Sequence, residues 1–413
     1  MAEQMKPSGI DWIGNIPSDW NAKKVKYVIS DIKDGTHGTF DRVESGELLL
    51  SAKNVFDDGI RIGENESEIS ILDYKSIISN GFPKKNDVLL CCVGTIGRCC
   101  VYEYDQSIAF QRSVAFLRPL QQTNARYLKY ALQSDSTLIQ EQFLINKSAQ
   151  DGLYMGSVRE LIIPYPNSKS EQQAIADFLD KECAQIDSIA ADLEKQIDLL
   201  QQYKKSLITE TVTKGLDKSV PMKDSGVEWI GEIPDHWDAK RMKYFLSVSS
   251  GDAITNEQLE DGKYPVYGGG KQMGCFNRTN VDKNKILIGR VGANCGCVTI
   301  TDVPSWATDN ALVVQTYCHF KYIYYLLISA DLNRLNEANA QPLITGAKVG
   351  NCVVSFAKNH AEQERIARYL DEHCEKIENI IVGKQKQLET IRQHKKSLIY
   401  EYVTGKKRVK EVQ

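Results

Sequence analysis

Two stretches of this chain are copies of one another, and they limit the possible folds more than any other feature. Residues 171–213 and 362–404 align without a gap at a constant offset of 191, with 20 of 43 positions identical. Neither copy contains proline, and only Gly383 disfavours helix, so each copy predicts one long α-helix. A helix of about 40 residues is roughly 60 Å long, which is too long to lie inside one compact domain.

Apolar residues recur along each predicted helix at alternating spacings of three and four. This pattern is typical of helices that pack in a coiled coil, and we expect the two copies to pair antiparallel with each other. Glu182 and Gln196 interrupt the first stripe, and Lys384 and His394 fall in register in the second. The residues predicted to form the helix pairing are Leu179, Ile186, Ile189, Leu193, Leu200, Tyr203, Leu207, Leu370, Ile377, Ile380, Ile391 and Leu398.

A second repeat precedes each of the two regions that lie before the helices. Residues 5–27 and 222–244, which we call the leader segments, share 14 of 23 positions at an offset of 217. Trp12 and Trp20 recur as Trp229 and Trp237, around a turn marked by glycine and proline. Large aromatic residues beside a turn usually pack, so we expect each leader segment to cover its domain or the helices rather than form a site.

The chain is therefore built as leader, domain, helix, and then the same three again. Both domains show a strand, a tight turn and a second strand (85–101 and 283–298), followed by further strand and a short helix. The predicted fold class is α+β: two mixed α/β domains separated by two long antiparallel coiled-coil helices, with a pseudo-two-fold internal repeat. The predicted boundaries are 1–169 for the first leader and domain, 170–214 for the first helix, 215–221 for a linker, 222–360 for the second leader and domain, 361–405 for the second helix, and 406–413 for a basic tail.

Composition excludes several classes of protein. No run of 18 apolar residues exists, and residues 1–12 lack an apolar signal region, so we expect no membrane span and a cytoplasmic location. The 11 cysteines include no CxxC pair, and the six histidines complete no zinc-finger spacing, so we expect free thiols and no metal site. The net charge of −3 requires any DNA-binding surface to be a local basic patch.

Signatures of catalysis are missing as well. The chain contains no phosphate-binding loop, no HExxH and no GxSxG, and Gly268–Lys271 lacks the frame of a phosphate loop. Polar and basic loops beside strands remain, and Arg, Lys, Asn and Gln are the residues that bond base edges. The residues predicted to bind DNA are Thr36, His37, Lys53, Asn54, Thr95, Arg98, Gln111, Arg112, Gln150, Tyr154, Tyr267, Lys271, Gln272, Arg290, Asn294, Asn310, Gln341 and Lys348.

The motifs together resemble one family. The leader MKxSGxxWIGxIPxxW and the helix start EQxxIxxxLDxxC, each present twice in register, resemble the specificity (S) subunit of type I restriction–modification systems, HsdS. The resemblance covers essentially the whole chain, and the two dissimilar domains resemble target recognition domains. Loops in such domains vary within this family, so the resemblance does not assign individual contact residues.

The resemblance implies a non-catalytic subunit. Each recognition domain would read one half of a bipartite site in double-stranded DNA, and the helices would set the gap and dock two methyltransferase (HsdM) subunits. No cofactor is expected in this chain; S-adenosylmethionine, ATP and Mg would be used by HsdM and by two restriction (HsdR) subunits. Two alternatives stay open: a coiled-coil scaffold whose domains bind proteins, and a specificity module of another DNA-modification system. The target bases and the gap length do not follow from the sequence.

Overall fold

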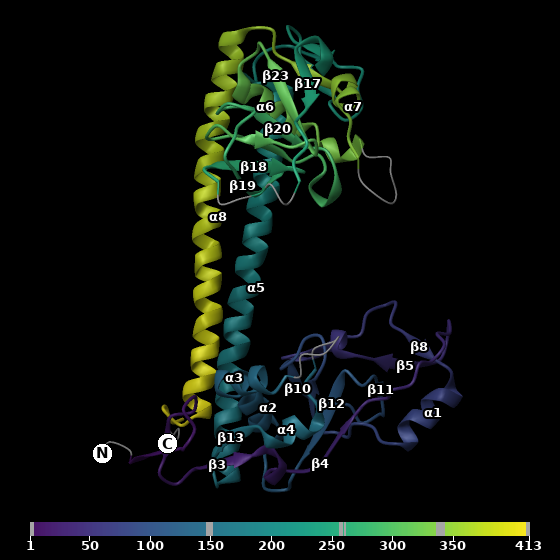
Figure 1. The fold of residues 1–413 in the computed structure, drawn as a ribbon, viewed down its shortest axis with the longest axis vertical. Helices are drawn as coiled ribbons and strands as arrows, with labels where there is room; N and C mark the ends of the chain where they lie inside the picture. The colour runs from purple at the N-terminus through teal and green to yellow at the C-terminus, as the bar shows by residue number, and fades with distance from the viewer. Residues whose placement is uncertain (1–3, 146–151, 256–258, 260–261, 336–342, 410–413) are drawn as a thin grey trace. The chain divides into compact units, whose positions relative to one another are not determined.

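The computed structural model describes residues 4–145, 152–255, 259, 262–335 and 343–409 (Figure 1). The chain divides into two compact units. The first unit contains Met1–Asp192 and Gln387–Gln413, and the second contains Leu193–Lys386. Each long helix therefore contributes one half to each unit: α5 spans Lys169–Lys214 and α8 spans His360–Val403. None of the described helices is long and apolar enough to cross a bilayer.

The first unit contains two sheets and a small pair of strands that joins the leader segment to the domain. A four-stranded antiparallel sheet has the order β10-β9-β12-β4, and a three-stranded sheet has the order β11-β5-β8 with β11 and β5 parallel. Strand β3 of the leader pairs with β13, which immediately precedes α5. The elements are β1 (Met5–Pro7), β2 (Asn15–Pro17), β3 (Asn21–Lys24), η1 (Val25–Tyr27), β4 (Ile29–Asp34), β5 (Glu47–Leu50), η2 (Ala52–Asn54), β6 (Val55–Phe56), β7 (Gly59–Ile60), β8 (Glu68–Ile69), α1 (Ile71–Ser79), β9 (Val88–Cys91), β10 (Cys99–Val101), β11 (Ala109–Phe110), β12 (Val114–Pro119), α2 (Ala125–Gln133), α3 (Asp135–Leu144), α4 (Met155–Glu160) and β13 (Ile162–Tyr165).

The second unit repeats this topology. Its four-stranded sheet has the order β17-β23-β20-β21, and its three-stranded sheet has the order β19-β18-β22 with β18 and β22 parallel. The elements are β14 (Met222–Asp224), β15 (Glu232–Pro234), β16 (Asp238–Arg241), η3 (Met242–Tyr244), β17 (Leu246–Ser250), β18 (Tyr264–Gly268), β19 (Lys271–Phe276), β20 (Ile286–Gly289), η5 (Gly292–Asn294), β21 (Val298–Ile300), β22 (Trp306–Ala307), β23 (Ala311–Thr316), α6 (Phe320–Ser329), η6 (Leu332–Leu335), α7 (Gly346–Asn351) and β24 (Val353–Phe356).

The two domains differ in the segments that come after their equivalent strands β5 and β18. In the first unit, β5 is followed by η2 and by the short hairpin β6–β7 before the chain reaches β8 and α1. In the second unit, Gly269 and Gly270, both with positive φ, turn the chain directly into β19. Residues 277–285, between β19 and β20, carry no helix equivalent to α1. Most of the greater length of the first domain therefore adds structure next to one strand, and the four-stranded sheet is alike in both units. A further difference lies after α2, where the first unit has α3 and the second has the short η6.

Each leader segment packs against the C-terminal end of a long helix. In the first unit, Ile13, Ile16 and Trp20 share a core with Leu398 and Val403 of α8. In the second unit, Ile230, Ile233 and Trp237 share a core with Ile208 and Val212 of α5. The two core tryptophans, Trp20 and Trp237, are fully buried. The leader segments are therefore packing elements, as the sequence predicted.

A glycine ends each helix at the point where the leader packs. Gly215 and Gly405 both have positive φ, a conformation that glycine adopts without strain and that commonly follows a helix. A Cβ at Gly405 would also lie 2.4 Å from the ring of Pro17. Both the backbone conformation and this close approach require glycine at position 405.

The helices run antiparallel within each unit. In the first unit, Phe178 of α5 packs against Tyr402 of α8 with 4.3 Å between ring centroids, and Asp187 pairs with Lys395 at 2.7 Å. In the second unit, Lys384 donates to Gln196 and Lys204 pairs with Glu378. The predicted antiparallel pairing is therefore present in both units.

The helix seam corrects part of the sequence prediction. Ile189 and Ile380 are 50% and 49% exposed, and Tyr203 is exposed too, so these three residues are not in the seam. At each of these places the residue that follows in the sequence is the buried or half-buried one. The residues of the seam are then spaced four and three positions apart in strict alternation. The seam comprises Leu179, Cys183, Ile186, Ala190, Leu193, Ile197, Leu200, Lys204 and Leu207 on α5, and Leu370, Cys374, Ile377, Ile381, Lys384, Leu388, Ile391, Lys395 and Leu398 on α8, each buried or half-buried.

The physical reason on α5 is that hydrophobicity favoured Ile189 over Ala190 and Tyr203 over Lys204, whereas on α8 hydrophobicity cannot distinguish Ile380 from Ile381. Ile189 is more apolar than Ala190, yet a small residue fits between two closely packed helices. Lys204 and Lys395 occupy seam positions because their aliphatic stems can be covered while their ammonium groups reach Glu378 and Asp187.

Candidate nucleic-acid interface

The loops that carry most of the predicted DNA-binding residues leave one edge of each four-stranded sheet. In the first unit, Cys91 at the end of β9 lies opposite Val114 at the start of β12, and Asp34 at the end of β4 lies opposite Ala115. We call this the reading edge. Because neighbouring strands are antiparallel, the ends of β4 and β9 and the starts of β10 and β12 all meet there.

Backbone hydrogen bonds hold the loops of the first reading edge together. The Thr36 amide donates to the Phe110 carbonyl at 2.7 Å, and the Arg112 amide donates to the Thr36 carbonyl at 2.9 Å. The Gln111 amide donates to the Leu50 carbonyl at 2.8 Å. Gly35 allows this approach, because a Cβ there would lie 2.1 Å from the Phe110 carbonyl oxygen.

Three predicted residues of the first unit line one hollow of about 610 Å³: His37, Arg112 and Tyr154. Asp34 and Met155 lie on the same hollow, and the His37 Nε2 is 2.7 Å from the Asp34 carboxylate. The Tyr154 side chain is exposed at the start of α4. A guanidinium, an imidazole and a phenol therefore line the same hollow, although they come from three segments that are distant in the sequence.

A second group of predicted residues lies around the β9–β10 turn and the β6–β7 hairpin. The Arg98 guanidinium is 5.1 Å from the centre of the Phe56 ring, and Arg61 lies over the same ring at 4.0 Å. Thr95 Oγ1 is 3.5 Å from the Ala52 carbonyl oxygen, and Lys53 pairs with Glu66 at 3.0 Å. Phe56 and Arg61 were not predicted from the sequence, although Asp58-Gly59 is a hairpin signal that could have indicated them.

The structure corrects the prediction for Asn54. Its side chain is buried, and it caps the short helix η2 by accepting from the Ser51 amide at 3.0 Å and donating to the Arg61 carbonyl at 3.1 Å. Both halves of the amide are used inside the domain, so Asn54 is a structural residue. Gln150 and Gln341 lie outside the described residues.

The second unit gathers its predicted residues around the carbonyl of Asn310. The amides of Gly269 and Arg290 both donate to this carbonyl at 3.0 Å, and the Thr308 amide donates to the Tyr267 carbonyl at 2.9 Å. A Cβ at Gly289 would lie 2.3 Å from the Asn294 carbonyl oxygen, so the turns after β18 and β20 pack closely at this edge.

Arg290 is held at the second reading edge by two side-chain hydrogen bonds. Its Nη1 donates to the Ser250 hydroxyl at 3.3 Å and to the Asp309 carbonyl at 3.2 Å. Its buried Nε has no hydrogen-bond partner among the described residues. Lys271 and Gln272 are exposed at the start of β19, and the Lys348 ammonium on α7 lies 3.2 Å from the Leu335 carbonyl. Cys297, which the sequence did not single out, is exposed beside Gly270.

The two reading edges have the same backbone plan and different side chains. Arg and Gln, Asn or Lys groups can make paired hydrogen bonds to base edges, whereas closely packed glycines let backbone amides approach phosphates. Among the described residues, no group of three His, Cys, Asp or Glu is placed to hold a metal ion. The side chains on the two edges are hydrogen-bond donors, hydrogen-bond acceptors and cations.

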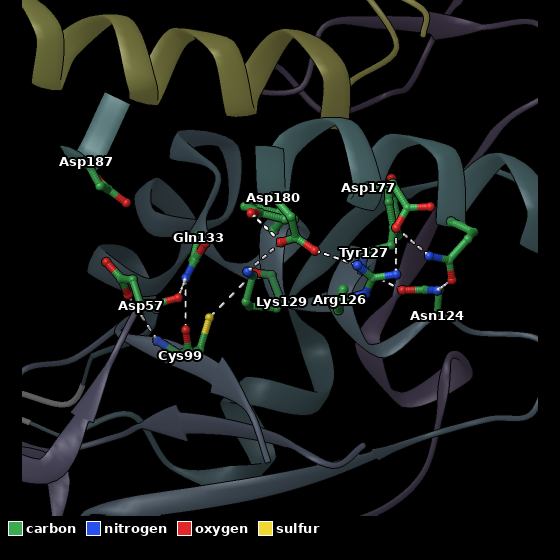
Figure 2. Close-up of polar contacts among 12 residues, drawn as sticks. Asp57, Cys99, Asn124, Arg126, Tyr127, Lys129, Gln133, Asp177, Asp180 and Asp187 are labelled. Carbon is green, nitrogen blue, oxygen red and sulfur yellow. Dashed lines mark hydrogen bonds and ion pairs between the residues drawn. The ribbon is translucent and has the colours of Figure 1, made fainter. Parts of the chain in front are cut away.

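A polar cluster fixes the first domain on α5 (Figure 2). Arg126 of α2 bonds Asp177 and Asp180 at 2.7 Å each, and Tyr130 donates to Asp180 at 2.6 Å. Burial opposes ionisation of Asp180, but hydrogen bonds from Tyr130 and Arg126 and the charge of Lys129 hold its pKa below the ordinary value. The position of the reading edge on the helix therefore depends on this cluster.

The second unit repeats the attachment. Lys321 and Tyr325 of α6 bond Asp371 of α8 at 2.6 and 2.8 Å. Asp371 is the repeat equivalent of Asp180, at the offset of 191. The same contact therefore mounts each domain at the same place along its own helix.

Comparisons with known proteins agree over most of the chain. The sequence model described as "Type I restriction modification DNA specificity domain" matches residues 40–199 and 234–390. The putative type I restriction enzyme MjaX specificity subunit of Methanocaldococcus jannaschii is 25% identical over 430 residues, 96% of each chain. The MjaVIII specificity subunit of the same organism is 24% identical over 438 residues, covering 96% of this chain and 95% of that protein.

A solved structure has a similar fold. The structure titled "Structural basis underlying complex assembly and conformational transition of the type I R-M system" has a TM-score of 0.67 at 9% identity, and the match covers 94% of this chain and 98% of that chain. At this level of identity the likeness concerns the fold alone.

Proposed function

Because this chain belongs to the type I restriction modification DNA specificity family and has a DNA-specificity role, we propose that each of its two domains reads one half of a bipartite site in double-stranded DNA. The observation that supports this proposal is the pair of reading edges. They share strand order and backbone contacts, yet they present different side chains. Two domains with the same backbone arrangement and different loop side chains can bind two half-sites of different sequence.

We assign the reading of bases to exposed or half-exposed residues on these edges. In the first domain they are Arg112, His37, Tyr154 and Arg98, and in the second domain they are Arg290, Lys271, Gln272 and Asn310. A bidentate contact from arginine to guanine contributes about 1–3 kcal/mol of discrimination against the wrong base. Because such contacts act on separate base pairs, a few of them in each domain specify a short half-site.

The long helices have a separate role in the proposal. We propose that they set the number of unread base pairs between the half-sites, and that they dock two HsdM subunits. The internal repeat supports two equivalent docking sites, because Ile189 and Ile380 are repeat equivalents and both are half-exposed on the helices. Two HsdR subunits would complete the restriction assembly.

The chain itself would be non-catalytic. S-adenosylmethionine would bind to HsdM, and ATP and Mg would be used by HsdR. This chain would supply only the recognition of the DNA sequence. We propose domain boundaries at 1–169 and 222–360, with helices at 170–214 and 361–405. In each case the leader segment is counted with the domain that comes after it.

Methylation mapping tests the proposal directly. Genomic DNA from cells that express this chain with its HsdM partner is sequenced by a long-read method that reports methyladenine. We expect one bipartite motif with a fixed gap and a methylated adenine in each half. An assembled complex that leaves the DNA unmethylated would contradict the proposal and would favour a protein-binding scaffold.

A further inference from the structure

Both leader segments carry basic residues whose charges are retained in the repeat, one near the start of the segment and three near its end. Four cationic positions and one tyrosine recur at the offset of 217, although other leader positions change. We call these two sets the leader basic segments. They are Lys6, Lys23, Lys24, Lys26 and Tyr27 in the first unit, and Lys223, Lys240, Arg241, Lys243 and Tyr244 in the second unit.

The tyrosines are exposed in both copies. Tyr27 is 63% exposed and Tyr244 is 60% exposed, each directly after a lysine whose ammonium lies over the ring, at 5.3 Å for Lys26 and 5.7 Å for Lys243. Packing within the chain does not require a large exposed aromatic residue at this place. Both rings are therefore accessible to a ligand outside the chain.

The second segment borders a hollow of about 440 Å³. Lys223, Lys240 and Tyr244 line it, together with Asp224 and Asp238. The carboxylate of Asp238 is paired with Lys358 at 2.9 Å. The two lysines of the hollow therefore face two aspartates, one of which is already paired with Lys358.

The first segment differs by one carboxylate. Glu160, at the end of α4, bonds Lys24 at 2.5 Å and Lys26 at 2.7 Å, and these contacts lower its pKa to about 2. In the second unit, Asn351 at the end of α7 takes this place and accepts from Lys243 at 3.0 Å. Glu160 thus partly neutralises the positive charge of the first leader basic segment. Asn351 carries no charge and does not neutralise the second.

We propose that the leader basic segments bind the phosphodiester backbone of duplex DNA without regard to its sequence. This rests on the proposed function, because it places the same DNA against both the reading edges and the leaders. Contacts to bases must differ between two half-sites, whereas contacts to phosphates carry no sequence information and can be alike in both. The reading loops differ between the units, and the leader basic segments do not.

The chemistry favours DNA over a protein partner. Lysine and tyrosine donate hydrogen bonds to phosphate oxygens, and lysine neutralises phosphate charge. Lysine is depleted in protein–protein interfaces, and seven of the eight cationic positions here are lysine.

The placement is also suitable. Helix α4 begins at Met155 on the reading-edge hollow and ends at Glu160 beside the leader basic segment. Six residues of helix span about 9 Å, so a duplex read at the edge can continue onto the leader. In the second unit, α7 connects the neighbourhood of Arg290 with Lys243 in the same way.

The test uses the assembled complex with HsdM and measures duplex binding over a range of salt concentrations. One duplex carries the methylated motif and the other, of equal length, lacks it. We expect Lys243→Gln to make the dependence of log K on log salt shallower by about 0.9 for one lost phosphate contact, equally on both duplexes. Lys75→Gln, which removes the same charge from the exposed face of α1, should leave the slope unchanged.

Two further variants sharpen the result. Glu160→Gln should steepen the slope on both duplexes, because it releases Lys24 and Lys26, whereas Arg290→Gln should weaken binding mainly to the duplex with the motif. A Lys243→Gln slope equal to that of the unchanged complex would overturn the inference. Loss of HsdM from the Lys243→Gln complex would overturn it too and would identify a protein-docking surface. Failure of the unchanged complex to bind either duplex would instead contradict the proposed function.

Discussion

Lys395 of α8 forms a 2.7 Å ion pair with Asp187 of α5, although 208 residues separate them in the sequence. Lys204 and Glu378 form the same pair at 2.7 Å in the second unit. These are the same contact made twice, because Lys204 and Asp187 become Lys395 and Glu378 when the repeat offset of 191 is added. The internal repeat of the sequence is therefore matched by a repeat of contacts between the helices. These two ion pairs are consistent with one antiparallel register along both helices.

The corrected seam gives a prediction on two adjacent isoleucines of one helix. Ile381 is 3% exposed and lies in the seam, whereas Ile380 is 49% exposed beside it. Ile381→Ala should lower the free energy of unfolding by about 2–4 kcal/mol, because it leaves a cavity between helices. Ile380→Ala should cost less than about 1 kcal/mol. Urea unfolding of both variants checks this, and equal losses would mean that the seam is misassigned.

Asn54 and Arg112 should separate stability from recognition. Asn54→Ala removes a cap and leaves buried backbone groups without partners, so it should destabilise the first domain by about 1–2 kcal/mol. Arg112→Ala should leave unfolding within about 0.5 kcal/mol and weaken binding to the motif. Thermal unfolding and a binding titration on each variant provide the two readouts. If the Asn54→Ala complex were folded and stable but could not bind DNA, Asn54 would have to be a DNA-binding residue.

Thiol reactivity should report on the second reading edge. Cys297 is exposed there, whereas burial raises the pKa of Cys91 to about 11 and of Cys92 and Cys100 to about 12. A maleimide at neutral pH should therefore label Cys297 well before these three, as peptide mass spectrometry can show. The label should reduce binding to the motif. The Cys297→Ser variant should bind the motif equally well before and after maleimide treatment. Labelled protein that binds as before would place Cys297 away from the DNA.

Glu141 should make stability depend on pH. Its carboxyl is buried in α3, Oε1 has no partner among the described residues, and burial raises its pKa from 4.5 to about 8. The folded protein therefore holds a proton that the unfolded chain releases. The stabilisation is complete below about pH 4.5 and is lost as the pH rises through about 8, at up to about 1.4 kcal/mol per pH unit.

The variant Glu141→Gln should remove this dependence and be more stable than the unchanged protein at pH 8.5. Urea unfolding at pH 5.5 and 8.5 measures the effect, with Glu44→Gln on the exposed surface as the control. A pH dependence that survives in Glu141→Gln would show that another group causes it.

Lengthening both helices should lengthen the gap between half-sites. Seven residues are inserted between Asp192 and Leu193 and between Leu388 and Glu389, which keeps the Lys395–Asp187 and Lys204–Glu378 pairs on their own sides of the insertions. One heptad adds about 10 Å of helix, or about three base pairs at roughly 3.4 Å each. Methylation mapping measures the gap. An assembled, active complex with an unchanged gap would exclude the helices as the spacer.

Periodicity and repetition in the sequence are enough to predict several parts of this protein. The helices over 171–213 and 362–404, the leaders that pack through Trp20 and Trp237, and the α+β fold class all arise from patterns that short-range physics controls. The family could also be recognised, because its motifs lie in these repeated segments.

Which residues contact one another depends on packing between elements that are distant in the sequence. The choice of Ala190 over Ile189 for the seam depends on the closeness of two backbones, and no scale of hydrophobicity contains that distance. Asn54 has the sequence character of a surface residue, but its side-chain amide donates to the Arg61 carbonyl inside the domain. The hollow that joins His37, Arg112 and Tyr154 depends on strand order, which brings three distant loops to one edge because antiparallel neighbours exchange their ends.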